Sequence, residues 1–174
     1  DEGYDVRTSE TIGMSQRGGC VTSNVRISGG FLSPAVPLSG ADLLIGFELC
    51  ETVRNIARLN EGGGAVLNSQ VIKPVTVSLG IQKYDTEKMM DFLKEKVKKL
   101  VVIDALKLAG EAGSSKATNV VMLGAAIGAG FLPFKKDKFM NVICINVPQK
   151  FRELNEKAFE SGYSFASNIK AQEE

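Results

Sequence analysis

Short apolar runs alternate with longer segments of helical periodicity along this chain. In the clearest example, residues 43–47 form an unbroken apolar run, and residues 48–59 then place their apolar side chains on one face of a helix. An unbroken apolar run is typical of a strand that is buried on both faces of a parallel sheet. The alternation predicts an α/β fold, with a Rossmann-like, mostly parallel sheet and flanking helices.

The remaining elements follow from the same two periodicities. Further strands are expected at residues 4–9, 21–28, 65–68, 75–79 and 101–103, and further helices at residues 86–100, 104–110, 119–132 and from residue 151 onward. We expect Thr86 to cap its helix, and the glycines at residues 62–64 to end the helix before them. In the helix at residues 119–132, small residues at 124, 125, 128 and 129 form a face that allows close packing, and we expect this face to be available to another subunit. A chain of 174 residues, 44% of them hydrophobic, predicts one domain over residues 1–166, followed by a polar tail at residues 167–174.

The loop at residues 13–19, Gly-Met-Ser-Gln-Arg-Gly-Gly, has the composition of a ligand-binding loop. Glycine lets backbone N–H groups approach a ligand closely, and the Arg17 guanidinium suits phosphate or carboxylate. Ser15 and Gln16 add further donors and acceptors. An ordinary tight connection, with Arg17 solvated or paired to a local acid, accounts for the same residues.

This loop belongs to the first of five ordered blocks of sequence, and the blocks together carry a resemblance. They lie at residues 8–27, 41–48, 103–105, 119–125 and 150–159. In this order they resemble the gamma-type domain of the 2-oxoacid:ferredoxin oxidoreductases, and most closely the small subunits acting on aryl pyruvates such as indolepyruvate. The likeness covers nearly the whole chain and is weaker around residues 75–99.

The chain departs from this family at its start and within the loop region. Members of the family begin with a strand and a glycine-rich loop that leads into a helix, and we expect both to be missing from this chain, which opens at Asp1. Ile12 and Asn24 stand where the family often has histidine, and Cys20 where it often has serine. A titrating imidazole is therefore not expected to act here.

The resemblance and the expected sheet together indicate a set of candidate cofactor-binding residues. Ligands of such sheets collect at the carboxyl ends of strands. The candidates are Glu10, Met14, Ser15, Gln16, Arg17, Gly18, Gly19 and Glu48. Glu10 ends the strand where a dinucleotide fold holds its ribose-binding acid. Alternatively, Glu48 only favours the N-terminus of the helix that it begins, and Asp104 is only a helix cap.

Composition argues against several functions for the chain by itself. Its 21 basic and 20 acidic residues leave a net charge of +1, so no field favours nucleic acid or a membrane surface. It has no histidine, and its three cysteines form no C-x-x-C pair, so neither an iron–sulfur nor a structural zinc site is expected. No catalytic residue and no metal ligand is assigned.

The resemblance implies a subunit of an enzyme that is inactive alone. A large alpha subunit is expected to carry thiamine diphosphate and iron–sulfur clusters and to decarboxylate the 2-oxoacid oxidatively. Coenzyme A would take the acyl group as co-substrate, and ferredoxin the electrons. A cytoplasmic location and some self-association are also expected. The alternative is a stand-alone Rossmann-like nucleotide-binding or regulatory module.

Overall fold

The computed structural model describes residues 3–13, 20–28, 30, 33–72, 77 and 84–173. The strands are β1 (Asp5–Ile12), β2 (Val21–Ser28), β3 (Ala41–Gly46), β4 (Leu59–Asn68) and β5 (Lys99–Ile103). The α-helices are α1 (Leu49–Asn55), α3 (Thr86–Lys96), α4 (Ala105–Ala112), α5 (Thr118–Gly128), α6 (Lys136–Asn146) and α7 (Arg152–Glu173), with 3-10 turns at Ile56–Arg58, Ser115–Ala117 and Gln149–Phe151.

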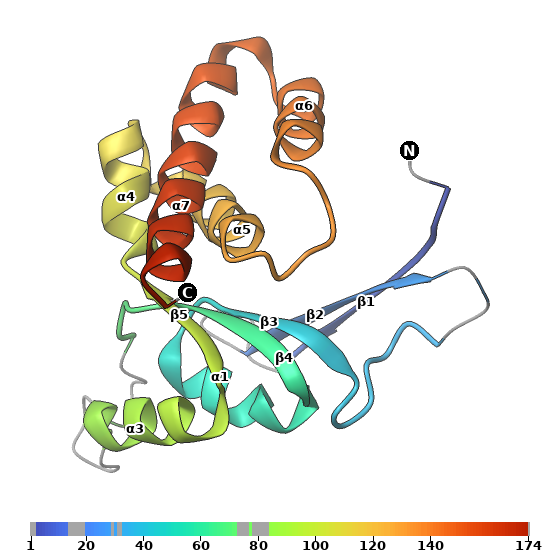
Figure 1. Cartoon of the computed structure of the whole chain (residues 1–174), viewed down its shortest axis with the longest axis vertical. Coiled ribbons are helices and arrows are strands. Elements are labelled where there is room, and N and C mark those ends of the chain that lie inside the picture. The colour runs from blue at the N-terminus through green and yellow to red at the C-terminus, as the bar shows by residue number, and fades with distance from the viewer. Residues whose placement is uncertain are drawn as a thin grey trace.

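The centre of the fold is a parallel sheet in the order β3-β4-β5, covered by helices on both faces. Helices α4, α5 and α7 lie over one face, and α1 and α3 lie over the other (Figure 1). Successive residues of a strand point to opposite faces, and the fully buried pair Val66 and Leu67 therefore belongs to two different hydrophobic clusters, one on each side. The predicted α/β class with a parallel sheet is confirmed.

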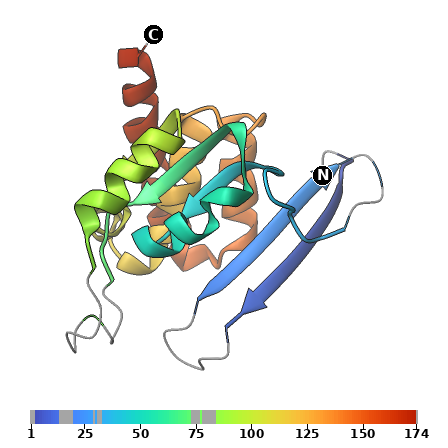
Figure 2. The same ribbon diagram turned by 90° about the horizontal axis from the view of Figure 1, so that it is seen from below.

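The two N-terminal strands pair only with each other. β1 and β2 form an antiparallel hairpin with Val6 opposite Ile27 and Ile12 opposite Val21. The hairpin stands beside the parallel sheet (Figure 2). The short connection between the strands permits antiparallel pairing, whereas parallel strands need a long crossover. These segments were expected as strands, but their separation from the main sheet was not.

β4 continues through the glycines that were expected to end a helix. The first helical segment ends at Asn55, a 3-10 turn follows, and β4 already begins at Leu59. The Phe131 ring lies so close to Gly64 that an added Cβ would come within 2.7 Å of it. The glycine is needed because an aromatic ring lies directly on the strand, and the predicted start of this strand at residue 65 was wrong.

Helices α5 and α7 are in close contact through glycine. A Cβ on Gly124 would lie 2.2 Å from the Phe159 carbonyl oxygen, and one on Gly162 would lie 2.0 Å from the Val121 oxygen. At each glycine, the backbone of the other helix thus occupies the space that a side chain would need. The small-residue face of α5 was predicted to allow close packing, which the structure confirms. We also expected this face to be available to another subunit, and that was wrong, because α7 covers it.

Other helix boundaries differ from those expected. Asp85, not Thr86, caps α3, because its carboxylate accepts from the Lys88 amide at 3.1 Å. α6 was not predicted. None of its residues is buried in the structure, and its sequence accordingly shows only a weak apolar periodicity. α7 continues through residues 167–173, the proposed polar tail, and Ile169 packs against the core there.

The expected strand at residues 75–79 lies almost wholly outside the described residues. Within the described part of the chain, no helix combines the length and apolarity needed to cross a membrane.

Candidate functional site

The carboxyl ends of β3, β4 and β5 meet at one edge of the parallel sheet. Glu48 follows β3 after Phe47, Asn68 ends β4, and Asp104 directly follows β5. Open parallel sheets bind their ligands at this edge. We call the edge formed by Glu48, Asn68 and Asp104 the carboxyl edge.

Asn68 connects the three strand ends by hydrogen bonds. Its side chain is 2% exposed. Its amide nitrogen donates to the Phe47 carbonyl oxygen at 3.3 Å, and its amide oxygen accepts from the Ala105 N–H at 3.1 Å. The Ser69 N–H adds a bond to the Ile103 oxygen at 2.9 Å. Asn68 therefore holds the carboxyl edge in place, and both of its polar atoms are engaged.

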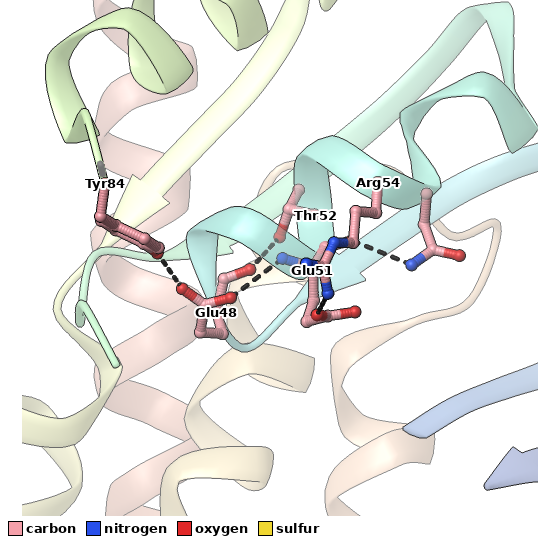
Figure 3. Close-up of polar contacts among 6 residues, drawn as sticks. Glu48, Glu51, Thr52, Arg54 and Tyr84 are labelled. Atoms are coloured by element: carbon pink, nitrogen blue, oxygen red, sulfur yellow. Dashed lines mark hydrogen bonds and ion pairs between the residues drawn. The ribbon is translucent and has the colours of Figure 1, made fainter. Parts of the chain in front are cut away.

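Glu48 caps α1 and accepts a hydrogen bond from a distant tyrosine (Figure 3). Its Oε2 accepts from the Glu51 N–H at 2.9 Å, and its Oε1 accepts from the Tyr84 hydroxyl. Burial, and then this bond to Glu48, raise the pKa of Tyr84 well above its usual range, so the phenol stays protonated and donating. Both carboxylate oxygens of Glu48 are thus used within the chain.

Further carboxylates cap the helices that start at or near this edge. Asp104 accepts from the Lys107 N–H at 3.0 Å at the start of α4, as its predicted alternative role requires. Asp85 does the same for α3. One amide N–H at the start of each of these helices is therefore already bonded to a carboxylate of the chain, and the carboxylates would repel an anion. The described residues of the carboxyl edge do not fit a diphosphate.

The hairpin comes close to α1 at the base of its loop. The Gly13 N–H donates to the Cys20 carbonyl oxygen at 2.9 Å, so the two ends of the connection are held together. The Glu51 carboxylate beside the Cys20 thiol raises the pKa of Cys20 through a hydrogen bond. Glu51 also pairs with Arg54 on its own helix (Figure 3). The segment from Gly13 to Cys20 thus begins and ends near the first turns of α1.

Of the eight predicted site residues, the structure describes Glu10 and Glu48, and it places them on different parts of the fold. Met14, Ser15, Gln16, Arg17, Gly18 and Gly19 lie outside the described residues. Glu10 is not at the carboxyl edge: it is an exposed residue of the hairpin whose carboxylate accepts from the Ser23 hydroxyl at 3.5 Å. The position expected for Glu10 was wrong, because β1 does not join the parallel sheet. Cofactor contacts by Glu48 and by the loop stay predictions.

The cysteines are dispersed over the fold. Cys20 adjoins the hairpin loop, Cys50 lies in α1, and the Cys144 thiol donates to Glu156 at 3.0 Å between α6 and α7. Burial raises the pKa of Cys50. Across the described ranges, no three Cys, Asp or Glu side chains are grouped to hold a metal ion. Two shallow open hollows, one beside α7 at Glu160 and one beside α3 at Phe92, contain no predicted site residue.

Sequence reasoning missed Tyr84. It lies 36 residues from Glu48 and just before the start of α3. No periodicity or motif marks it, because only the packing of α3 beside α1 brings the phenol to the carboxylate. Asn68 was noted as a residue at a strand end, but its bonds to the two neighbouring strand ends could not be derived from spacing.

The family model described as pyruvate ferredoxin/flavodoxin oxidoreductase matches residues 1–165. The chain belongs to this family, and the resemblance stated from its sequence is confirmed. Among curated relatives, the indolepyruvate oxidoreductase subunit IorB of Thermococcus kodakarensis is 38% identical over 96% of this chain and 84% of its own length. The same subunit of Archaeoglobus fulgidus is 36% identical over 94% of this chain and 82% of its own length.

Solved structures share the fold. The gamma subunit of a keto/oxoacid ferredoxin oxidoreductase from Geobacter sulfurreducens superposes with a TM-score of 0.63 at 21% identity, covering 94% of this chain and 81% of that one. A 2-oxoglutarate:ferredoxin oxidoreductase from Magnetococcus marinus gives a TM-score of 0.62 at 19% identity, covering 95% of this chain but 26% of that one. In the second protein, the fold is therefore one part of a much longer chain.

Proposed function

We propose that this chain is the small subunit of an indolepyruvate:ferredoxin oxidoreductase. The observation that carries the proposal is the sequence identity of 36–38% to the IorB subunits of Thermococcus kodakarensis and Archaeoglobus fulgidus, over 94–96% of this chain. The substrate class is an aryl pyruvate. The reaction releases carbon dioxide, joins the acyl group to the sulfur of coenzyme A and passes the electrons to ferredoxin.

The catalytic groups belong to a larger partner subunit in this proposal. Thiamine diphosphate and the iron–sulfur clusters bind there. The chemistry of the described residues supports this division, because the side chains of Glu48, Asn68 and Asp104 at the carboxyl edge are already engaged by other groups of the chain. The small subunit acts by binding the large subunit and through the loop at residues 13–19.

The loop is the part of this chain that we propose to meet a ligand. Arg17 would bind negative charge, either the diphosphate of coenzyme A or thiamine or a carboxylate of the large subunit. The ends of the loop, Gly13 and Cys20, lie beside α1, and Glu51 there is already paired with Arg54.

Arg17→Ala should lower kcat/KM of the complex by roughly 10- to 150-fold, because a charge-assisted bidentate contact contributes about 1.5–3 kcal/mol. Arg17→Lys should also be damaging, since an ammonium cannot reproduce the planar fork. Steady-state kinetics for coenzyme A and for the 2-oxoacid test this, with the melting temperature as the control for folding. A lower melting temperature with unchanged kinetics would assign Arg17 to a local ion pair.

The substrate assignment is tested on the complex of this chain with the large subunit. We expect kcat/KM for indolepyruvate to exceed that for pyruvate and for 2-oxoglutarate. A preference for either of the smaller substrates would leave the family assignment intact and remove the aryl pyruvate. Tight binding of a free nucleotide by this chain alone would favour the alternative of a nucleotide-binding module.

A further inference from the structure

The hairpin β1-β2 has two faces of opposite character. Residues directly opposite each other in an antiparallel pair share a face, and successive residues of a strand belong to opposite faces. One face, here called the outer face, consists of Val6, Thr8, Glu10 and Ile12 from β1 and Val21, Ser23, Val25 and Ile27 from β2. The other, the inner face, is polar and includes Ser9, Thr11, Thr22, Asn24 and Arg26.

The polar face is the one that contacts the rest of the chain. The Ser9 hydroxyl donates to the Pro34 oxygen at 3.4 Å, and the Arg26 guanidinium donates to the Ser33 oxygen at 2.9 Å. Ser9, Thr22, Asn24 and Arg26 are all half-buried. The usual arrangement, in which a sheet turns its apolar face to the core, is therefore reversed in this hairpin.

The outer face leaves its aliphatic side chains in solvent. The exposed fractions are 68% for Ile12, 60% for Val21, 59% for Val25, 55% for Val6 and 44% for Ile27. Ile12 and Val21 lie on one side of the Glu10–Ser23 pair, and Val6, Val25 and Ile27 lie on the other. An exposed apolar surface of this extent is typical of a protein interaction site. A two-stranded hairpin is also marginally stable by itself, so an additional layer on this face would stabilise it. We therefore expect another protein surface to cover the outer face.

The charge on the outer face distinguishes between possible partners. Glu10 is its one charged member, and no member is Lys or Arg. Glu10 lies between Thr8 and Ile12 on the same strand, and its polar neighbour across the hairpin is the Ser23 hydroxyl. A second copy of this chain, packed face to face, would bury two Glu10 carboxylates with no Lys or Arg on either outer face to pair with them, which is costly.

We propose that the outer face of the hairpin is the docking surface for the large subunit, which covers the aliphatic residues with apolar side chains and places a Lys or Arg opposite Glu10. The proposal rests on the proposed function, since it takes the large subunit as the partner. It also explains why the polar face points inward: the inner face fastens the hairpin to the domain by hydrogen bonds, and the outer face is left for the complex.

A matched pair of threonines tests the assignment of the face. Thr8 and Thr11 lie on the same strand, are both exposed and belong to opposite faces. Thr8→Lys should weaken binding of the full chain to the large subunit by roughly 10- to 100-fold, because it buries a second cation on the covered face beside the Lys or Arg that the partner places opposite Glu10. Thr11→Lys should leave the dissociation constant within about threefold of the wild type.

The charge is tested at Glu10. Glu10→Lys should weaken binding at least as much as Thr8→Lys, whereas Glu10→Gln should cause a smaller loss and a weaker salt dependence. Isothermal titration calorimetry at two salt concentrations measures both, and circular dichroism checks that each variant is folded. Equal affinity of Thr8→Lys and wild type would overturn the inference and leave the proposed function standing.

The other outcomes are equally decisive. Failure of the wild-type chain to bind the large subunit would contradict both the inference and the proposed function. A wild-type dimer that Thr8→Lys converts to a monomer, with unchanged binding to the large subunit, would assign the outer face to a second copy and overturn the inference.

Discussion

Gly162→Ala is expected to lower the free energy of unfolding by about 3 kcal/mol, since strained overpacking costs 1–3 kcal/mol and more where the neighbour cannot yield. The new Cβ would lie 2.0 Å from the Val121 oxygen and 3.0 Å from the Ala125 nitrogen. Both atoms are backbone of α5, so α5 and α7 would have to move apart along their whole contact. Urea denaturation measures the loss, and we expect the melting temperature to fall by about 10 °C.

Gly110→Ala in α4 is the matched control. An added Cβ there meets nothing within 4 Å, and the residue lies within a helix, where alanine is favoured over glycine by about 1 kcal/mol. We therefore expect Gly110→Ala to stabilise the protein slightly. If both variants were stabilised, the close contact between α5 and α7 would be contradicted.

Asn68→Ala is expected to lower the free energy of unfolding by about 2–4 kcal/mol, because a buried N–H and a carbonyl oxygen would each lose their partner. The groups are the Ala105 N–H at the start of α4 and the Phe47 oxygen after β3. Since Asn68 connects all three strand ends, hydrogen exchange should also rise at the amides of Ala105 and Ser69.

Asn60→Ala provides the comparison at the opposite end of the same strand. The Asn60 side chain donates to Asp42 at 2.7 Å and accepts from the Gly62 N–H at 3.0 Å, and both hydrogen bonds are solvent-exposed. Because water can replace both partners, their loss should change stability by about 0.5 kcal/mol or less. Equal losses for Asn68→Ala and Asn60→Ala would contradict the role assigned to Asn68 in holding the carboxyl edge.

The central sheet was predictable because its determinants are local. The apolar run at residues 43–47 and the amphipathic segment after it produce β3 and α1, and Asp104 caps α4 as its position suggested. The glycines of α5 predicted close packing. That α7 is the helix packed against them was not predictable. Gly124 of α5 lies against the backbone of α7 and Gly162 of α7 lies against the backbone of α5 only because α7 folds back over the sheet.

Less of the candidate site than of the fold could be predicted from the sequence. Glu48 was singled out correctly as a residue at a strand end, but its bond with Tyr84 depends on the packing of α3 beside α1. Glu10 was misplaced because two strands with a short connection formed a hairpin of their own. The alternation of Val21, Val25 and Ile27 in β2 was visible in the sequence, and only the structure shows that this apolar face points away from the core.

The measurement that tests the central claim most directly is turnover with and without the large subunit. Purified chain, large subunit and the two combined are assayed with indolepyruvate, coenzyme A, thiamine diphosphate and a viologen dye as electron acceptor. We predict dye reduction and acyl-coenzyme A formation only in the combined sample, because Glu48, Asn68 and Asp104 of the carboxyl edge are engaged in hydrogen bonds within the chain and none of its residues is assigned a catalytic role. Turnover by this chain alone, or full activity of the large subunit without it, would contradict the account.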